Sequence, residues 1–194
     1  MNASQVLTPP LTTARDHDLA HRHRYGDETA FREIYDRFSP MVYNLCLRLS
    51  GDPSRAQDLS QEVFLRVFKG LPRYRGASSL KTWIYSIALN HCRGRLGRRG
   101  LELTELDDEN WAQGPADPAR GPEENLLVRD GERRIAKALL ALPVRFREAV
   151  VLRDLEGLSY EEIAAVLRVR TGTVRSRIAR GRERLRGLLE SQHP

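Results

Sequence analysis

Residues 157–185 constrain the fold of this chain more than any other stretch, because they carry the pattern of two short helices joined by a tight break. Ser159 precedes the first helix as its predicted N-cap, and Glu162 three residues later completes a capping box. The apolar residues of the first helix share one face, at Tyr160, Ile163, Ala164 and Leu167. Those of the second helix do the same, at Val174, Ile178, Gly181 and Leu185. This pairing predicts a helix-turn-helix over residues 160–179.

The outer side of the second helix is polar, with a hydroxyl-bearing start and several arginines after it. Such a helix suits the major groove of DNA, where arginine binds guanine edges and phosphates. A solvated basic helix on an ordinary bundle is the competing interpretation, because runs of charge usually face water. The preceding helix of matching length favours DNA binding.

The overall charge agrees with a polyanionic partner but does not identify one. The chain has 194 residues, a formal net charge of +6 and a pI of about 9.7, and its length allows one large domain or two small ones. Cys46 and Cys92 form no CxxC motif, so we expect small apolar core groups and neither a metal nor a cofactor. No apolar run approaches the roughly 20 residues of a membrane span, and no signal peptide is apparent, which predicts a cytoplasmic protein.

Residues 1–25 show no apolar period, so we expect a disordered leader there. Residues 26–99 instead carry the spacing of four helices. The predicted start signals of the first three are Asp27, the pair Ser39 and Pro40, and a capping box of Ser54 with Gln57. The fourth helix is expected over about residues 80–97, after a loop at residues 74–79.

This loop and the fourth helix interleave aromatic and basic side chains, at Tyr74, Trp83, Tyr85, Arg93 and Arg95. The combination is typical of a surface for single-stranded nucleic acid, where bases stack on aromatic rings and arginines bind phosphates. Core packing of Trp83 is an equally weighted interpretation, because apolar neighbours share its helical spacing. Arginines at a helix C-terminus also complement the helix dipole without any ligand.

Residues 100–127 form an acidic stretch between two basic parts of the chain. They include eight acidic residues and one arginine, a net charge of −7, with glycine and proline at intervals. Because like charges repel and proline and glycine interrupt helices, we expect a flexible tether. Its charge would also let it imitate nucleic acid in a basic channel of a partner. Residues 128–190 then carry the spacing of four helices, the helix-turn-helix among them.

Four motifs, read together, resemble the bacterial sigma-70 family of RNA polymerase sigma factors, in its short extracytoplasmic-function (ECF) group. They are DLSQEVFLRVF at 58–68, YRGASSLKTWIYSIALN at 74–90, LPVRFREAVVLRDLEGLSYEEIA at 142–164 and GTVRSRIARGRERL at 172–185. The resemblance covers nearly all of residues 26–189. It implies an all-α chain of two small helical domains, a sigma-2-like bundle at 26–99 and a sigma-4-like helix-turn-helix domain at 128–190, joined by the flexible acidic linker.

The resemblance also implies a promoter-specificity subunit with no catalytic activity of its own. Its partners would be core RNA polymerase, promoter DNA and an anti-sigma factor, with no small-molecule substrate. Within the polymerase it would contact the clamp helices of the largest subunit and the flap of the second-largest subunit. The linker would thread toward the active site and the RNA exit path, and the loop at 74–79 would capture a base flipped from the opened minus-ten element.

Residues that match the family's motifs are assigned by that resemblance to three surfaces. Core polymerase would be bound by Asp58, Leu59, Gln61, Glu62 and Leu65. The minus-ten element would be bound by Tyr74, Arg75, Ser78, Ser79, Lys81, Trp83, Tyr85, Asn90, Arg93 and Arg95. The minus-thirty-five element would be bound by Arg170, Thr171, Thr173, Val174, Arg175, Ser176, Arg177, Arg180 and Arg184.

A second hypothesis is a helix-turn-helix transcription regulator whose N-terminal domain is a sensor. It would require a ligand cavity or a phospho-acceptor pocket in residues 26–99, and no acidic pocket pattern is present there. A nucleic-acid enzyme is a third class. The carboxylates are scattered on helix faces and His91 stands alone, so the sequence offers no metal or nucleophile constellation.

Overall fold

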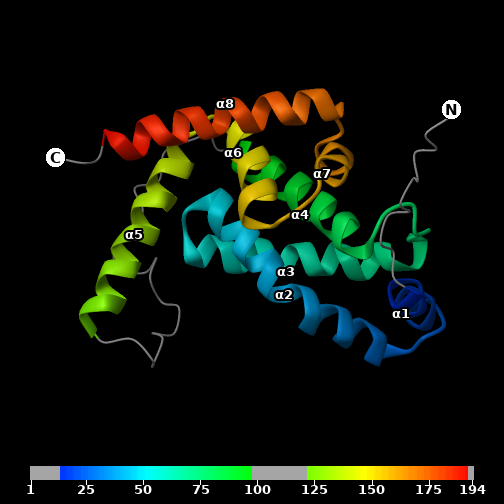
Figure 1. Ribbon diagram of the computed structural model, residues 1–194. Helices are drawn as coiled ribbons and strands as arrows, with labels where there is room; N and C mark the ends of the chain where they lie inside the picture. Colours follow the sequence, from blue (N-terminus) through cyan, green and yellow to red (C-terminus); the bar gives the residue numbers. More distant parts are fainter. Residues whose placement is uncertain (1–13, 98–121, 192–194) are drawn as a thin grey trace, which may run out of the picture.

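The computed structural model describes residues 14–97 and 122–191, and every regular element within these ranges is a helix (Figure 1). The first range, here called the first unit, holds α1 (Ala14–Arg24), α2 (Glu28–Ser50), α3 (Pro53–Gly70), the short 3-10 helix η1 (Leu71–Arg73) and α4 (Leu80–Gly97). The second range, the second unit, holds α5 (Pro122–Ala141), α6 (Val144–Val150), the π-helix η2 (Val151–Leu155), α7 (Tyr160–Leu167) and α8 (Thr171–Glu190). The predicted all-α class is confirmed.

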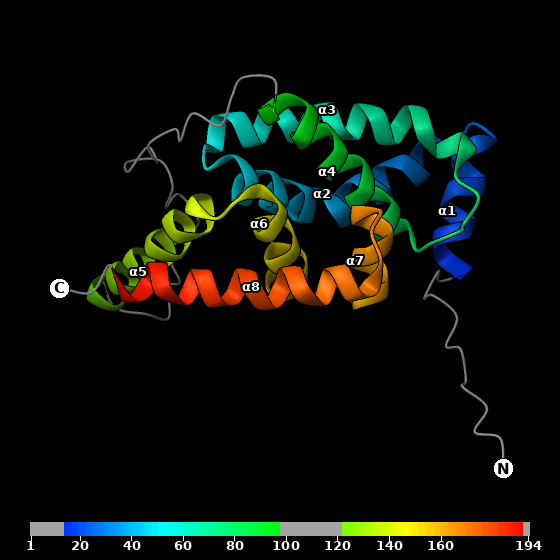
Figure 2. The ribbon, with the colours of Figure 1, turned by 90° about the horizontal axis from the view of Figure 1, so that it is seen from above.

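The first unit is built on α2, α3 and α4, which pack along their apolar faces (Figure 2). Ile34 of α2, Val63 of α3 and Ile84 of α4 are completely buried in the shared core. Burial of one such side chain contributes about 1.5–3 kcal/mol to folding. Cys46 and Cys92 lie in the same core as free cysteines with their sulfur atoms 3.7 Å apart, in agreement with their predicted apolar role.

Helix α2 runs without a break through Pro40, where the sequence predicted one helix to end and another to begin. Proline in a helix interior removes one main-chain hydrogen bond and crowds the preceding turn. Here the proline faces solvent, while Phe38 before it and Val42 after it are buried in the same core. Packing of both halves on one core therefore outweighs the local cost.

Helix α1 occupies residues that were predicted to belong to a disordered leader. It lies against α2 and η1, and it buries Leu19 and Ala20. A charged residue, Asp16, is also buried and accepts a hydrogen bond from Arg37 Nη1 at 3.0 Å. Helix α1 is thus held by polar contacts to distant elements as well as by apolar packing. Because the spacing of apolar residues reports only the packing, it did not predict this helix. Residues 1–13 of the predicted leader lie outside the described residues.

The start of α3 also differs from the prediction. Asp52, rather than Ser54, is the N-cap, because its carboxylate accepts a hydrogen bond from Arg55 N at 3.0 Å. Pro53 then occupies the first turn, where its missing N–H has no intrahelical partner to lose. Asp27 caps α2 as predicted, by accepting from the main-chain N of the second helical residue.

The helix-turn-helix is present in the second unit, with α7 and α8 as its two helices. Ser159 and Glu162 form the predicted capping box: Glu162 N donates to Ser159 Oγ, and Ser159 N donates to Glu162 Oε2. Helix α7 ends at Leu167, and its C-cap residue Arg168 adopts a left-handed conformation with a φ of 56°. Gly181 of α8 lies so close to α6 that a Cβ there would be 2.6 Å from Val150 Cγ2. The glycine therefore permits the contact between these helices.

Helix α5 begins at Pro122, inside the stretch that was predicted as a flexible linker. Proline is favoured in the first turn of a helix. Residues 122–127 are therefore helical, and the remainder of the predicted linker lies outside the described residues.

The two units lie against each other, with α7 in contact with α4 and α5 in contact with α2 (Figures 1 and 2). Arg147 of α6 is buried between them. Its guanidinium donates to the main-chain oxygens of Leu139 at 2.9 Å and Leu142 at 3.2 Å, and across the interface to Leu49 of α2 at 3.0 Å. Burial lowers the pKa of Arg147 from its ordinary value. One guanidinium thus connects both units through main-chain oxygens.

Within residues 14–97 and 122–191, no helix combines the length and the apolar character needed to cross a membrane. The same part of the chain contains no group of three histidine, cysteine, aspartate or glutamate residues arranged to hold a metal ion.

Candidate nucleic-acid and polymerase interfaces

The outer face of α3 presents an exposed surface of mixed acidic and apolar character. Asp58 and Gln61 are exposed, and Leu65, four residues after Gln61, is 61 % exposed. Leu59 was predicted to share this surface, but it is only 4 % exposed because it belongs to the core of the first unit. The available surface therefore centres on Leu65.

Glu62, on the same helix, is already engaged within the chain. Its carboxylate accepts hydrogen bonds from Nε and Nη2 of Arg95, and His91 Nε2 lies 2.8 Å from Glu62 Oε2. The hydrogen bond from Arg95 is the main reason why the pKa of Glu62 is lowered. Glu62, predicted to contact polymerase, and Arg95, predicted to contact DNA, are thus paired with each other in this arrangement.

The loop at residues 74–79 is shaped by its own polar contacts. Tyr74 is buried, and its hydroxyl donates to Ser78 O at 2.5 Å. Ser79 is also buried, and its Oγ accepts from Thr82 N at 3.1 Å, which caps the start of α4. Arg75 is exposed. Of these predicted DNA contacts, Tyr74 and Ser79 therefore build the loop, and Arg75 is free to reach a ligand.

Helix α4 divides the predicted aromatic contacts between core and surface. Trp83 is half-buried and its ring centroid lies 5.2 Å from that of Tyr74, so it packs against the core and stays partly accessible. Tyr85 is completely buried, and its hydroxyl donates to Glu156 Oε2 at 2.5 Å. Asn90 is exposed. Tyr85 cannot contact DNA in this arrangement because the second unit covers it.

Two further predicted DNA contacts on α4 also meet the second unit. Arg93 donates to both carboxylate oxygens of Glu148, at 2.6 and 2.7 Å. Lys81 Nζ donates to Glu156 O at 3.3 Å. The carboxylate of Glu156, 7 % exposed, is also paired with Arg48. The face of α4 that carries these basic groups is therefore occupied by acidic groups of the second unit.

Helix α8 leaves its predicted duplex-binding face open to solvent. The exposed residues on this face are Arg170, Arg175, Ser176, Arg180 and Arg184, and the half-buried ones are Thr171, Thr173 and Arg177. Val174 was also predicted to contact DNA, but it is completely buried because it points into the core of the second unit. Aromatic rings support two of the arginines: Arg175 lies over Tyr160 at 5.5 Å and Arg184 over Phe146 at 5.0 Å.

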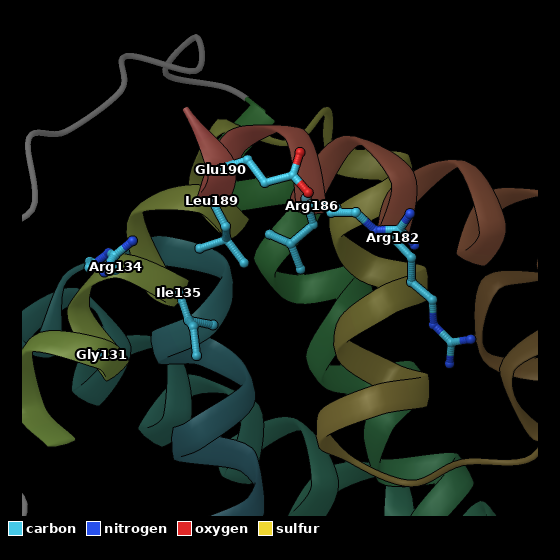
Figure 3. A pocket seen from close by; sticks show the side chains of 8 residues that line it. Gly131, Arg134, Ile135, Arg182, Arg186, Leu189 and Glu190 are labelled. Atoms are coloured by element: carbon cyan, nitrogen blue, oxygen red, sulfur yellow. The ribbon is translucent and has the colours of Figure 1, made fainter. Parts of the chain in front are cut away.

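A groove of about 520 Å³ separates α5 from the C-terminal part of α8 (Figure 3). Figure 3 shows Ile135 of α5 and Leu189 of α8 on its facing sides, with Arg134 and Arg182 at its edges. Ile135 is 44 % exposed and lines the groove together with Leu185 and Leu189, so the groove offers an apolar contact surface.

Glu148, Glu156 and Arg147 were missed as interface residues by the reasoning from sequence. They lie in the motif at 142–164, where apolar residues alternate with other charged ones such as Arg145 and Asp154, and each is buried or half-buried. Charged residues are rarely buried unless they are paired. Because exposed charged residues such as Arg145 and Asp154 stand in the same motif, the sequence did not distinguish these three as buried.

The comparisons with known proteins agree with this geometry. Residues 34–101 match the family model described as "Sigma-70 region 2", and residues 132–185 match the one described as "Sigma-70, region 4". The chain is 35 % identical to the RNA polymerase sigma-H factor of Pseudomonas aeruginosa, over 89 % of this chain and 93 % of that protein. It is 38 % identical to the ECF RNA polymerase sigma-E factor of Escherichia coli K12, over 87 % of this chain and 91 % of that protein.

Solved structures with a similar fold include a sigma factor bound to an anti-sigma factor. The sigma factor RpoE from Bartonella quintana, solved with the anti-sigma factor NepR, aligns with a TM-score of 0.64 at 27 % identity, over 84 % of this chain and 98 % of that one. CnrH, solved with the cytosolic domain of CnrY, aligns with a TM-score of 0.67 at 24 % identity, over 92 % and 99 %, and supports the fold alone. With both regions matched in order and relatives aligned over nearly their whole length, the chain belongs to the sigma-70 family of RNA polymerase sigma factors, among its ECF members.

Proposed function

We propose that this sigma factor directs core RNA polymerase to its promoters through three surfaces on two units. The observation that supports this most directly is the different chemistry of two exposed helix faces: α3 presents Asp58 and Gln61 beside the exposed Leu65, and α8 presents arginines. The first suits a basic protein surface with an apolar anchor, and the second suits the major groove of duplex DNA. The alternative of a regulator with an N-terminal sensor is not favoured, because residues 34–101 match sigma-70 region 2.

On promoter DNA, α8 would read the minus-thirty-five element through Arg177, Arg180 and their exposed neighbours. The loop at 74–79 and α4 would receive the opened minus-ten element, with Asn90 on a base edge and Arg93 on the backbone. Since Lys81, Tyr85 and Arg93 contact the second unit here, the two units would have to separate before strand binding. The arrangement described above would then be a resting form.

On the polymerase, Asp58, Gln61 and Leu65 would contact the clamp helices of the largest subunit. Glu62 would join them once Arg95 turns to DNA, because the two side chains are paired here. The apolar groove between α5 and α8 would receive the flap of the second-largest subunit, with Ile135 and Leu189 as its contacts.

Membership of the sigma-70 family also suggests how this chain is regulated and where it acts. The similar structure of RpoE contains an anti-sigma factor, and we infer that a partner of this kind also holds this chain inactive. Sigma factors are as a rule initiation factors without catalytic activity, and we propose the same here. The chain would act in the cytoplasm, where core polymerase and promoter DNA are found.

Transcription in vitro with purified core polymerase and a promoter library tests this proposal. The wild-type chain should start transcription at promoters that share an upstream and a downstream element. Leu65→Ala together with Asp58→Ala should weaken binding to core polymerase while leaving the affinity of the second unit for duplex DNA unchanged, and Arg180→Ala should do the reverse. Asp36→Ala, an exposed acid on α2, is the matched control. A wild-type chain that does not associate with core polymerase would contradict the proposal.

A further inference from the structure

Helix α1 holds the loop at residues 74–79 in place, although it precedes the residues that match sigma-70 region 2. Arg24 Nη2 donates to Tyr74 O at 3.2 Å, at the start of the loop. At the end of the loop, Leu80 N donates to Asp16 Oδ2 at 3.3 Å. Leu80 is the first residue of α4, and its N–H has no acceptor within the helix. The buried carboxylate of Asp16 therefore supplies a cap from a different element.

In the middle of the loop, Gly76 packs closely against the side chain of His17 in α1. Gly76 has a φ of +71°, a conformation that favours glycine, and a Cβ built on it would lie only 1.9 Å from His17 Cε1. The imidazole of His17 is exposed to solvent, and its centroid lies 6.2 Å from that of the Tyr74 ring. The loop thus approaches α1 more closely than any side chain at position 76 would allow.

A cavity of about 570 Å³ opens between α1 and the start of the loop. Its lining residues are His17, Asp18, Ala20, His21, Arg24, Tyr74 and Arg75. An adjoining hollow is lined by Arg24, Pro72, Arg73 and Arg75, so the two share a pair of arginines. The volume falls within the range of small-molecule sites in proteins, about 300–1,000 Å³.

The charge of this cavity is positive. Arg24, Arg73 and Arg75 are exposed, and none of them forms an ion pair with another residue in the part of the chain that the structure describes. Asp18, the one carboxylate in the lining, is 3.7 Å from Arg22. Aromatic rings beside unpaired arginines are the combination that binds single-stranded nucleic acid, because rings stack on bases and guanidinium groups bind phosphates.

We propose that α1 forms one wall of a pocket for a single-stranded deoxynucleotide of the opened promoter. The exposed imidazole of His17 is the stacking face for the base, the buried Tyr74 ring is the floor, and Arg24 and Arg75 bind the adjacent phosphate. His17 is then a specificity-determining residue that lies outside the part of the chain matched to region 2. This inference depends on the proposed function, in which the loop at 74–79 receives the minus-ten strand.

The test uses holoenzyme assembled from the full-length chain and core polymerase, on promoters randomised across the minus-ten element and its neighbouring bases. His17→Ala should change the base preference at one or two adjacent positions by about 5- to 100-fold, the range expected for loss of one stacking contact. Arg24→Ala should lower strand opening on all sequences and reduce its dependence on salt concentration. Arg15→Ala, an exposed arginine of the same helix that does not line the cavity, should do neither.

Unchanged base preferences in His17→Ala, together with unchanged opening in Arg24→Ala, would overturn the inference. The proposed function would survive that result as long as the wild-type and Arg15→Ala holoenzymes still select promoters. Failure of the wild-type chain to direct transcription would instead contradict the proposed function itself. Thermal unfolding of each variant identifies a folding defect, and His17→Gln, which keeps a side chain of similar length beside Gly76, should show the same altered base preference.

Discussion

Arg93 and Glu148 form a two-point ion pair between α4 of the first unit and α6 of the second. The Nε and Nη2 atoms of Arg93 donate to Oε1 and Oε2 of Glu148 at 2.6 and 2.7 Å, and the Glu148 side chain is 3 % exposed. The hydrogen bond to Glu148 is the main reason why the pKa of Arg93 is raised. Because Arg93 is also proposed to bind the promoter, closure of the two units and DNA binding compete for one guanidinium.

Replacing Glu148 with glutamine should shift the two units toward separation. Glutamine keeps the size of the side chain but removes the charge, so Arg93 would lose an ionic partner, with an expected cost of about 1–3 kcal/mol. Single-molecule energy transfer between dyes on α3 and α8 measures the separation directly. Glu161→Gln, at an exposed position on α7, is the control. A distance distribution identical to that of the wild type would show that this ion pair does not hold the units together.

The hydroxyl of Tyr85 should resist ionisation in alkali. Burial and the neighbouring Glu156 raise the pKa of Tyr85 far above its ordinary value of 10.0. Since the pKa is raised in the folded chain, this group contributes fully to stability below about pH 10, and the contribution is lost as the pH rises further. In an ultraviolet titration, Tyr85→Phe should therefore leave the amplitude of the transition near pH 10 unchanged. A smaller amplitude in the variant would contradict the buried position.

Replacing Arg147 with lysine should destabilise the chain strongly. A lysine ammonium is a single point donor and cannot reach the main-chain oxygens of Leu49, Leu139 and Leu142 together, so buried acceptors would lose their partners. We expect a decrease of about 2–4 kcal/mol in the free energy of unfolding, measured with urea. Arg145→Lys, at an exposed position two residues away, should change the free energy of unfolding by less than about 0.5 kcal/mol.

Two glycines of α8 should respond in opposite directions to alanine. At Gly181 a new Cβ would lie 2.6 Å from Val150 Cγ2, so Gly181→Ala should push α8 away from α6 and cost about 1–3 kcal/mol. At Gly187 a Cβ would meet nothing within 4 Å, so Gly187→Ala should stabilise the helix by about 0.5–1 kcal/mol. Thermal denaturation of both variants tests the pair, and a stabilised Gly181→Ala would contradict the close packing.

The two cysteines should react with alkylating reagents only after unfolding. Both thiols are buried, and the contact with Cys46 together with burial raises the pKa of Cys92 well above its ordinary value. The thiolate is the reactive form, so a raised pKa and a lack of access both slow the reaction. Mass spectrometry after brief exposure to iodoacetamide should find no label in native buffer and two labels in urea. Rapid labelling of native protein would show that the core opens readily.

Local patterns in the sequence were sufficient for the helices that carry their own signals. The capping box of Ser159 and Glu162 and the apolar faces of α7 and α8 are as the sequence predicted. Helix α4 also has its expected bounds, Leu80–Gly97. These features depend on hydrogen bonds and side-chain spacing within a few residues, so the chain specifies them without reference to its distant parts.

The contacts between individual residues could not be predicted from the sequence, because they depend on which distant elements pack together. Leu59 and Val174 are buried although their motifs suggested contacts with partners. Helix α1, which the sequence did not predict, packs on α2 and η1 and is hydrogen-bonded to both ends of the loop before α4. The sequence by itself therefore determined the family, the helices that carry their own capping and apolar signals, and the chemistry of their faces. The tertiary structure alone decided that Arg93 meets Glu148, 55 residues away, because burial of a charge is tolerated only where folding brings the opposite charge beside it.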